Sequence, residues 1–453
     1  MSIDNKEDDY PSPKYAWYVV GVLTVAYIVS FIDRQIMSLM VVPIQRDLEL
    51  NDFQLSLLSS VSFAIFYTFF GIPLGRLADT QSRRGLIFFG VTFWSLMTAG
   101  CGLTKKFWDL AIMRMGVGVG EATLSPAAYS LIADYFPPHR RSTAMSVYSM
   151  GIYIGSGMAF ILGGLVVKFT SAQESFDVPI IGIVRSWQLV FFIVGLPGLL
   201  VAFLLLTVKE PVRRGKSGTA HAAAPAATIR ETLAYVSDNW ATFVCLNIGV
   251  SFVTLNSYAS TQWLPAMFVR RFEWTQGGTG MIYGLIVGTF GTLGVVGGGW
   301  LADWWTARGR MDAPVRVAWM ATLCNLPWII LYPLATTGEV TAVLLIPMVF
   351  FASMPFGVAP AAIQRMMPST MRAQATSIYL FTINLIGMGI GPSITGWLTD
   401  NLFHDKTQVH RSLQIVGITS YICAAVLIGI SLKSYRGTLD YLQKWTPPPA
   451  KEA

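Results

Sequence analysis

Apolar residues along this 453-residue chain gather in long blocks that short polar segments separate. A helix that crosses a bilayer needs about 20 mostly apolar residues, and 12 blocks reach that length. We therefore expect an all-α polytopic membrane protein with 12 transmembrane helices. The expected helices cover residues 15–43, 54–80, 85–103, 107–135, 142–168, 187–208, 238–269, 278–305, 315–334, 341–364, 373–400 and 412–433.

Two short motifs recur at equivalent places in the first and second six helices. Gly75-Arg-Leu-Ala-Asp79 returns as Gly299-Trp-Leu-Ala-Asp303, and Pro126-Ala-Ala returns as Pro360-Ala-Ala. Parallel repeats with a site between them are typical of transporters. The expected domains are a tail at 1–14, a six-helix bundle at 15–208, a linker at 209–237, a second bundle at 238–433 and a tail at 434–453.

The linker at 209–237 is basic and rich in Ala and Pro near its centre, which is typical of a flexible connection. Its end reads Thr228-Ile-Arg-Glu231, a capping box that predicts the start of a short helix. We expect this helix to lie on the membrane surface.

Composition and charge support the membrane class and give an orientation. Hydrophobic residues make up 53% of the chain and charged residues 13%, whereas soluble proteins carry about 25% charged residues. The net charge is +7, but the cations form no patch or stripe, so we expect no nucleic-acid partner. If the N-terminus is cytoplasmic, 21 of the 32 Lys and Arg residues fall in inside segments and nine outside. Both termini are therefore expected in the cytoplasm, at a plasma or inner membrane.

The residues that usually perform catalysis or bind metals are few and scattered. The four histidines lie in expected loops or in the linker, at His139, His221, His404 and His410. The four cysteines lie in apolar blocks, and no pair has metal-ligand spacing. We therefore expect neither an enzyme nor a bound metal or cofactor.

The turn after the second helix resembles the cytoplasmic loop signature of the major facilitator superfamily. It reads Gly75-x-x-x-Asp79-x-x-x-Arg83-Arg84, although Thr80 and Ser82 replace the usual basic residue and glycine. Gly75 permits close helix packing, and Asp79 accepts hydrogen bonds from the other bundle. With Asp303 at the repeated motif, these residues form an expected conformational latch. A basic turn that only sets the topology is the alternative.

Three ionisable residues are expected deep inside the first bundle. Arg114 and Glu121 are seven residues apart on one helix, so they share a face, and Asp33 lies at a depth between them. Charges within membrane helices are costly and usually functional. We expect Asp33 and Glu121 to share Arg114, with a fixed ion pair as the alternative. Arg34 is expected on another face, reaching outward or pairing locally, without a substrate role.

Residues 30–165 contain three short motifs: Asp33-Arg34, the run Gly118-Val-Gly120-Glu121-Ala that leads to Pro126, and Arg141-Ser142. These motifs carry a resemblance to the Spinster branch of the major facilitator superfamily. It implies proton-linked or facilitative export of sphingolipids and lysophospholipids. It further implies that Asp33, Arg114 and Glu121 couple protons to transport.

The second half has no ionisable residue near mid-membrane, so its candidate binding residues are neutral. With a charged head group at Arg114 and Glu121, an apolar tail would lie along the second bundle. The candidates are Asn247, Phe252, Asn256, Tyr258, Gln262, Trp263, Phe356, Asn384 and Met388. For any single aromatic residue or Met in this set, ordinary packing is the alternative.

The sequence thus predicts a monomeric transporter that moves an amphipathic lipid or lipid-like molecule with protons by alternating access, surrounded by membrane lipids. A proton-coupled transporter of small organic anions or drugs is one alternative, with Arg114 binding a carboxylate. A membrane receptor or scaffold that moves nothing is the other.

Overall fold

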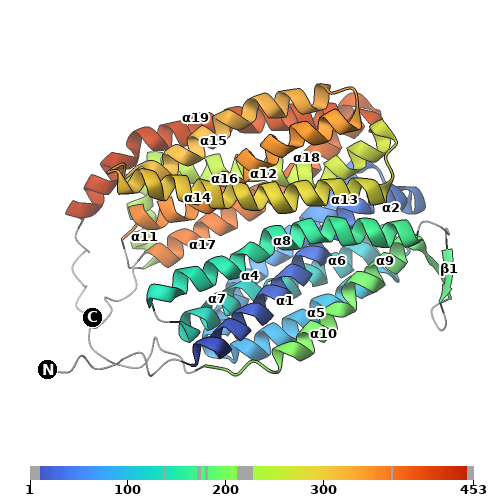
Figure 1. The fold of residues 1–453 in the computed structure, drawn as a ribbon, viewed down its shortest axis with the longest axis horizontal. Helices are drawn as coiled ribbons and strands as arrows, with labels where there is room; N and C mark the ends of the chain where they lie inside the picture. Colours follow the sequence, from blue (N-terminus) through green and yellow to red (C-terminus); the bar gives the residue numbers. More distant parts are fainter. Residues whose placement is uncertain are drawn as a thin grey trace.

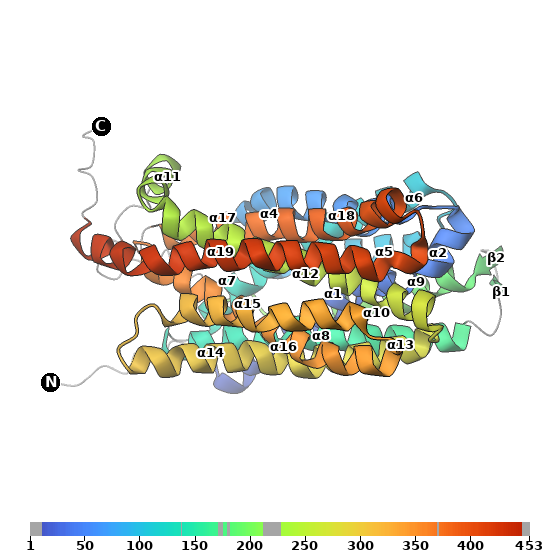
Figure 2. The same cartoon turned by 90° about the horizontal axis from the view of Figure 1, so that it is seen from above.

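The computed structural model describes residues 11–136, 138–170, 175–178, 182–211, 228–368 and 371–445. Long helices run along the longest axis of the molecule in two groups, one above the other (Figure 1). Figure 2 shows the same arrangement turned by 90°. The lower group in Figure 1 contains α1 and α4 to α10, the upper group contains α12 to α19, and α2 lies beside α13 at the right-hand end.

The first group begins with a 27-residue helix that has proline in its first turn, where the missing N–H is not needed. Its helices are α1 (Pro13–Leu39), α2 (Val41–Leu48), α3 (Asp52–Ser56), η1 (Leu57–Val61), α4 (Ser62–Thr80), α5 (Arg83–Cys101), α6 (Phe107–Glu121), α7 (Leu124–Tyr135), α8 (Pro138–Thr170), α9 (Ser186–Gly195) and α10 (Pro197–Leu205). A hairpin of β1 (Ser175–Val178) and β2 (Gly182–Arg185) joins α8 to α9, with Ser175 opposite Arg185.

The second group follows a short surface helix, α11 (Ile229–Asp238). Its helices are α12 (Trp240–Phe272), α13 (Gln276–Ile286), η2 (Val287–Gly291), α14 (Thr292–Ala307), α15 (Ala313–Leu331), η3 (Tyr332–Leu334), α16 (Gly338–Met366), α17 (Arg372–Ile383), η4 (Asn384–Ile390), α18 (Gly391–Leu398), η5 (Thr399–Phe403), η6 (Lys406–Gln408) and α19 (Val409–Lys444).

The expected polytopic helical fold is confirmed. Eleven helices among the described residues are long and apolar enough to cross a membrane. The expected helix at 107–135 is divided into α6 and α7 at Ala122 and Thr123, so neither part reaches the length of a full span. The arrangement is consistent with twelve crossings, of which the fourth is interrupted.

Some boundaries differ from the expected ones. The β1–β2 hairpin was not anticipated, because its residues lack a long alternating pattern. Helix α19 continues to Lys444, beyond the expected end at residue 433. The predicted capping box is confirmed, with Glu231 N–H donating to Thr228 Oγ1 over 3.3 Å and Thr228 N–H donating to Glu231 Oε2 over 2.8 Å. Most of the linker, residues 212–227, lies outside the described residues.

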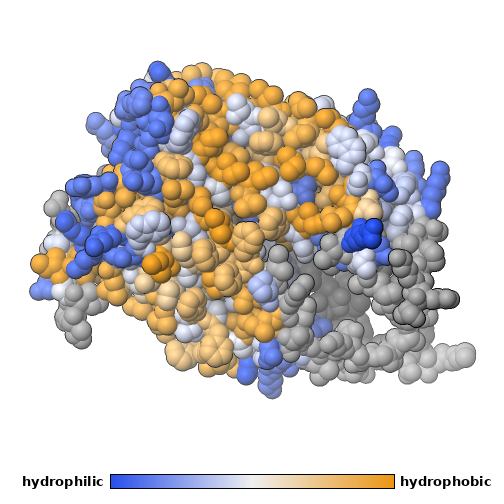
Figure 3. Space-filling view, turned by 180° about the vertical axis from the view of Figure 1, so that it is seen from behind, coloured by the Kyte–Doolittle hydropathy of each residue, from blue (hydrophilic) through white to orange (hydrophobic). Residues whose placement is uncertain are grey.

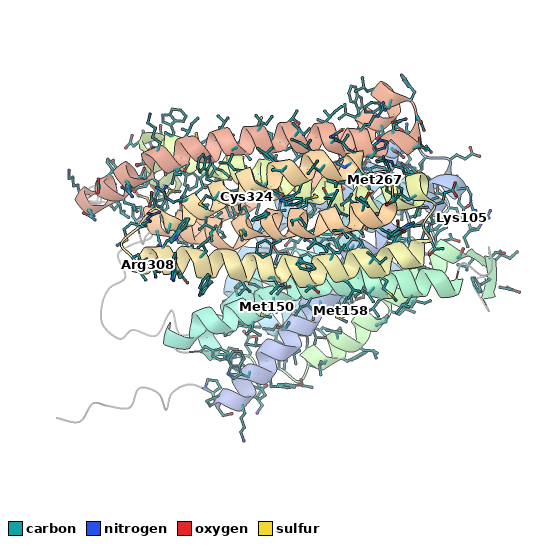
Figure 4. All side chains as sticks on the ribbon, turned by 45° about the horizontal axis from the view of Figure 1, so that its top comes forward. Lys105, Met150, Met158, Met267, Arg308 and Cys324 are labelled. Atoms are coloured by element: carbon teal, nitrogen blue, oxygen red, sulfur yellow. The ribbon has the colours of Figure 1, made fainter. Side chains whose placement is uncertain are left out.

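A broad apolar surface lies between two polar ends (Figure 3). Such a belt is what a helical bundle presents to the hydrocarbon of a membrane. Lys105 and Arg308 lie at opposite ends of the helices (Figure 4). We call the end with Arg308, where α1 begins and α19 ends, the terminal end, and the end with Lys105 and β1 the distal end.

Glycines allow the two groups to approach closely along α8 and α13. A Cβ added to Gly280 would lie 2.5 Å from the carbonyl oxygen of Phe160, and one added to Gly157 would lie 2.7 Å from Cα of Gly288. Larger residues would force these backbones apart, so small residues are required at this contact.

An ion pair joins the groups at the distal end. The guanidinium of Arg270 on α12 donates two hydrogen bonds to the carboxylate of Asp52 on α3, over 2.8 and 2.9 Å. Gln45 accepts a third over 2.6 Å, and both charged side chains are buried. The backbone N–H of Phe53 also donates to Asp400 over 2.7 Å. The distal ends of the two groups are therefore held together.

Candidate functional site

Glu121, the last residue of α6, is buried and receives hydrogen bonds from α1. Arg34 donates to Glu121 Oε2 from Nη2 over 2.5 Å and from Nε over 3.2 Å. The Ser30 hydroxyl donates to the same oxygen over 2.7 Å. Buried charges are usually paired in this way, because an isolated charge in a low-dielectric interior is costly. One oxygen of Glu121 is thus fully used, while Oε1 has no hydrogen-bond partner among the described residues.

Asp33 and Arg114 are also fully buried but have fewer partners. Asp33 Oδ2 accepts a hydrogen bond from Thr98 on α5 over 3.3 Å. Arg114 Nη1 donates over 3.5 Å to the backbone carbonyl of Asp33, a long contact. Asp33 Oδ1 and Arg114 Nε and Nη2 are buried without a partner among the described residues. This side of the cluster can therefore accept further polar contacts.

Aromatic rings of α1 and α4 surround the Arg34 guanidinium. Its Cζ lies 4.7 Å from the centre of the Phe63 ring, 4.8 Å from that of Phe31 and 5.0 Å from that of Tyr67. Cζ of Arg114 is 5.4 Å from the centre of the same Phe63 ring. Cation–π attraction stabilises both cations in an apolar setting.

Arg34 therefore corrects two expectations from the sequence. Its expected placement away from the cluster is wrong, and Glu121 pairs with Arg34 instead of sharing Arg114 with Asp33. Residues i and i+4 of a helix share a face, so Ser30 and Arg34 both reach Glu121 while Asp33 points about 100° away. The Ser30–Arg34 spacing was the sequence signal that would have found this pair.

The neutral candidates of the second half are not all in one place. Tyr258 and Met388 pack against the apolar core of the first group, and Tyr258 interacts electrostatically with Arg34. Asn384 begins the π-helical segment η4, and Phe356 packs against an apolar core to which both groups contribute. The remaining candidates lie along α12.

Four of those candidates on α12 are buried, Gln262 among them. Trp263 donates its indole N–H to the carbonyl of Pro392 over 2.9 Å, which ties α12 to α18. Asn247 and Asn256 keep amide atoms without a partner among the described residues. Trp263 thus has a packing role in this structure, whereas the two asparagines retain hydrogen-bonding capacity.

The basic residues of the expected latch belong to a cluster within the first group. Arg83 pairs with Asp134 on α7 and donates from Nε to Glu210 over 2.8 Å. The backbone N–H of Arg84 donates to Glu210 over 2.9 Å. Asp134 and Glu210 were missed as partners because neither has a marked sequence spacing to Arg83.

Of the other latch candidates, the structure describes the surroundings of Gly75 and Asp303. A Cβ on Gly75 would touch Pro126 of the same group at 3.8 Å. Asp303 on α14 is exposed. The side chain of Asp79 lies outside the described residues, so the latch stays a prediction. Among the described residues, no group of three or more His, Cys, Asp or Glu side chains has a metal-binding arrangement.

A family model described as Major Facilitator Superfamily matches residues 23–392 of the chain. The chain belongs to this superfamily. Its members are transporters, and the membrane helices of this chain make it an integral membrane transporter of that fold. The match covers both helix groups, including the charge cluster and the ion pair at the distal end.

Relatives within the superfamily span most of the chain. An MFS-type efflux pump of Mycolicibacterium smegmatis is 28% identical, covering 96% of this chain and 97% of its own. A probable L-galactonate transporter of Escherichia coli is 26% identical, covering 83% and 81%. A sphingosine-1-phosphate transporter of Xenopus tropicalis is 24% identical, covering 88% and 77%.

A solved structure gives the same picture for the fold. A bacterial homologue of the human lysosomal transporter Spinster, in an inward-facing and unoccupied conformation, superposes with a TM-score of 0.77. It is 26% identical over 97% of this chain and 100% of its own. The resemblance to the Spinster branch that the sequence predicted is therefore confirmed.

Proposed function

We propose that this transporter couples proton movement to the passage of an amphipathic lipid or lipid-like molecule of the sphingolipid or lysophospholipid class. The observation that carries the proposal is the unequal pairing of the four buried charges. Arg34 and Glu121 form an ion pair through Oε2, while Asp33 and Arg114 beside it keep polar atoms without a partner among the described residues. An incomplete set of buried charges is suited to binding a proton or a charged group.

Protonation of the acids would then free the arginine side chains to bind an anionic group of the substrate. A proton on Glu121 removes the charge that holds Arg34, and the released guanidinium can bind a phosphate or carboxylate. Arg114 already offers Nε and Nη2 to such a group. Asp33 is the acid without an ion pair. Binding a proton would remove its uncompensated buried charge, so Asp33 is the acid that protonation would stabilise most.

The neutral candidates would accommodate the rest of an amphipathic substrate. Tyr258 and Met388 lie against the first group near the charged residues, where a head group and a tail would meet. Asn384 and Phe356 of the second group would supply further contacts to the substrate. Asn247 and Asn256 would supply hydrogen bonds to neutral polar atoms of the substrate.

Alternating access follows if the distal end is extracellular, as the distribution of Lys and Arg predicts. The Asp52–Arg270 pair then closes the extracellular side. The likeness to an inward-facing Spinster homologue supports this assignment. Both termini are cytoplasmic in this orientation.

Reconstituted transport with defined pH gradients tests the coupling. Asp33→Asn and Glu121→Gln should each abolish accumulation of a sphingoid base or lysophospholipid driven by a pH gradient. Asp109→Asn, which removes an exposed acid from the first turn of α6, should behave as the wild type. If both cluster variants still concentrate substrate in response to pH, these acids do not couple protons.

A transporter of small organic anions is the second candidate, favoured by the probable L-galactonate transporter among the relatives. A series of lipids with one head group and increasing chain length separates the two. Each buried methylene contributes about 0.8 kcal/mol, so the affinity for an amphipathic substrate should rise with chain length. If the affinity does not change with chain length and sugar acids compete for binding, the result would favour the small-anion transporter. Absence of flux for either class would favour a receptor or scaffold.

A further inference from the structure

A charged groove lies between α15 and α19, outside the charge cluster and the bundle interface. Its volume is about 360 Å³, and its lining residues are Asp312, Arg316, Trp319, Gly429, Leu432, Lys433 and Arg436. Helices α15 and α19 lie side by side in Figures 1 and 2, on the outer side of the second group. The groove is therefore open to the surroundings of the protein and not to its centre.

Asp312 organises the basic residues of the groove. Arg316 donates from Nη2 to Asp312 Oδ2 over 2.6 Å, and Arg436 donates from Nη2 to Oδ1 over 3.4 Å. Burial raises the pKa of Asp312, but the hydrogen bond and charge of Arg316 and the charge of Arg436 bring it below its usual value. Asp312 thus stays ionised and offsets one of three positive charges.

The groove keeps a net positive charge and unused donors. The lining has three cations, on Arg316, Lys433 and Arg436, and one anion, on Asp312, which gives a net charge of +2. Nε of Arg316 is buried and has no hydrogen-bond partner among the described residues. A phosphate monoester or diester matches this set, because guanidinium groups bind phosphate oxygens through paired hydrogen bonds.

One wall of the groove is apolar and fixed in position. Trp319 donates its indole N–H to the carbonyl of Ala425 over 2.9 Å. A Cβ on Gly429 would lie 3.0 Å from Nε1 of Trp319, so glycine permits the indole to approach α19 closely. Leu432 completes the wall. A ligand in the groove would therefore contact charge on one side and an aromatic surface on the other.

Apolar residues continue from the groove along the surfaces of both helices. On α15, Met320 lies one turn from Arg316 and is exposed, as is Cys324 farther along (Figure 4). On α19, Ile430 and Val426 lie on the face of Lys433 and are exposed. An acyl chain that starts at the groove would meet these apolar side chains along the two helices.

We propose that this groove binds the phosphate of an anionic phospholipid from the leaflet at the terminal end, with the acyl chains along α15 and α19. Basic pockets between membrane helices on the cytoplasmic side are suited to such head groups. The ligand is a resident membrane lipid and not the transported molecule, because the groove faces away from Arg34 and Glu121.

Lipid titration of the purified full-length protein tests this site. Native mass spectrometry would follow binding of phosphatidylglycerol, with phosphatidylcholine, glycerol phosphate and inorganic phosphate as separate arms. The wild type should bind phosphatidylglycerol in preference to phosphatidylcholine, and neither soluble phosphate should displace it. Two basic residues near an anionic head group account for a change of about 30-fold, so the double variant Lys433→Gln and Arg436→Gln should weaken binding by about that factor.

A matched control separates the groove from general surface charge. The double variant Arg308→Gln and Lys444→Gln removes two exposed cations from the same end and should bind phosphatidylglycerol as the wild type does. Equal loss in both double variants would overturn the proposal, as would displacement by inorganic phosphate. Loss in Arg34→Gln with retention in the groove variant would also overturn it, because binding would then be at the central cluster.

Discussion

Arg34 contributes more to the charge cluster than any other single side chain, since it pairs with Glu121 and contacts three aromatic rings. Arg34→Gln should leave Glu121 buried without a cation, and removing one partner of a buried ion pair typically costs about 3–5 kcal/mol. We expect a lower midpoint of thermal unfolding and no pH-driven transport. Arg34→Lys keeps the charge but loses the planar contacts, so it should give an intermediate result.

Lys105→Gln, at an exposed site of the distal end, is the control for Arg34. It should match the wild type in thermal unfolding and in transport. Wild-type behaviour of Arg34→Gln would show that the pair with Glu121 has no part in stability or coupling.

At the scale of single residues, the sequence predicted which charges are buried but not how they pair. Depth along a helix follows from counting residues, and Asp33, Arg114 and Glu121 are indeed buried. Pairing depends on the rotation of α1 relative to α6, and packing of side chains such as Phe63 sets that rotation. No single sequence encodes this angle in a short motif, and Arg34 was therefore misplaced.

At the scale of elements, Glu210 fixes the start of α5 to the segment that follows α10. Burial raises the pKa of Glu210, but hydrogen bonds from the Arg84 backbone and the Arg83 guanidinium bring it below its usual value. The stabilisation is then complete above the pKa of the unfolded chain, about 4.3, and is lost as the pH falls below it. It should not vary between pH 6 and 8.

Glu210→Gln should lower the thermal midpoint slightly at pH 7, by the equivalent of about 1 kcal/mol or less, because the side chain is partly exposed. The difference from the wild type should shrink as the pH is lowered below 4. Glu339→Gln, an exposed acid in the first turn of α16, is the matched control. A difference that grows at low pH would contradict the assigned role.

Helix bounds were predicted well because the apolar blocks and their polar separators mark each crossing. The exceptions have physical causes. Helix α19 continues past the apolar block because Tyr435 remains buried and donates to the carbonyl of Ala362 over 2.9 Å. The break between α6 and α7 falls inside an apolar block, where no polar separator marks it.

At the scale of the whole molecule, the Asp52–Arg270 pair is expected to hold the distal ends together. Asp52→Asn should remove one partner of a buried pair, at a cost of about 3–5 kcal/mol, which is enough to change a conformational ratio more than tenfold. Spin labels at Lys105 and Asn401, with the native cysteines replaced, would report the distance between the groups. In Asp52→Asn we expect a second, longer distance between the two labels that is absent from the wild type.

Asp109→Asn, an exposed acid at the same end, should leave the distance distribution unchanged. An unchanged distribution in Asp52→Asn would mean that the glycine contacts between α8 and α13 hold the distal end without the ion pair. In the sequence, 218 positions separate Asp52 from Arg270, so their pairing emerged only from the packed structure.

Four segments of the membrane helices, η1, η2, η4 and η5, have π-helical geometry. A π turn holds more residues than an α turn, so each such segment changes the rotational phase of its helix by up to about 100° per extra residue. A helical wheel drawn through residues 374–398 will therefore assign Ile390 and later positions to the wrong face. When sequence alignments or cysteine-accessibility data for this helix are mapped onto a helical wheel, the residues before η4 and those after it must be drawn on separate wheels. Deleting one residue from η4 should convert this segment to a regular α-helix. The helix on each side of the deletion should keep its present orientation toward its neighbours.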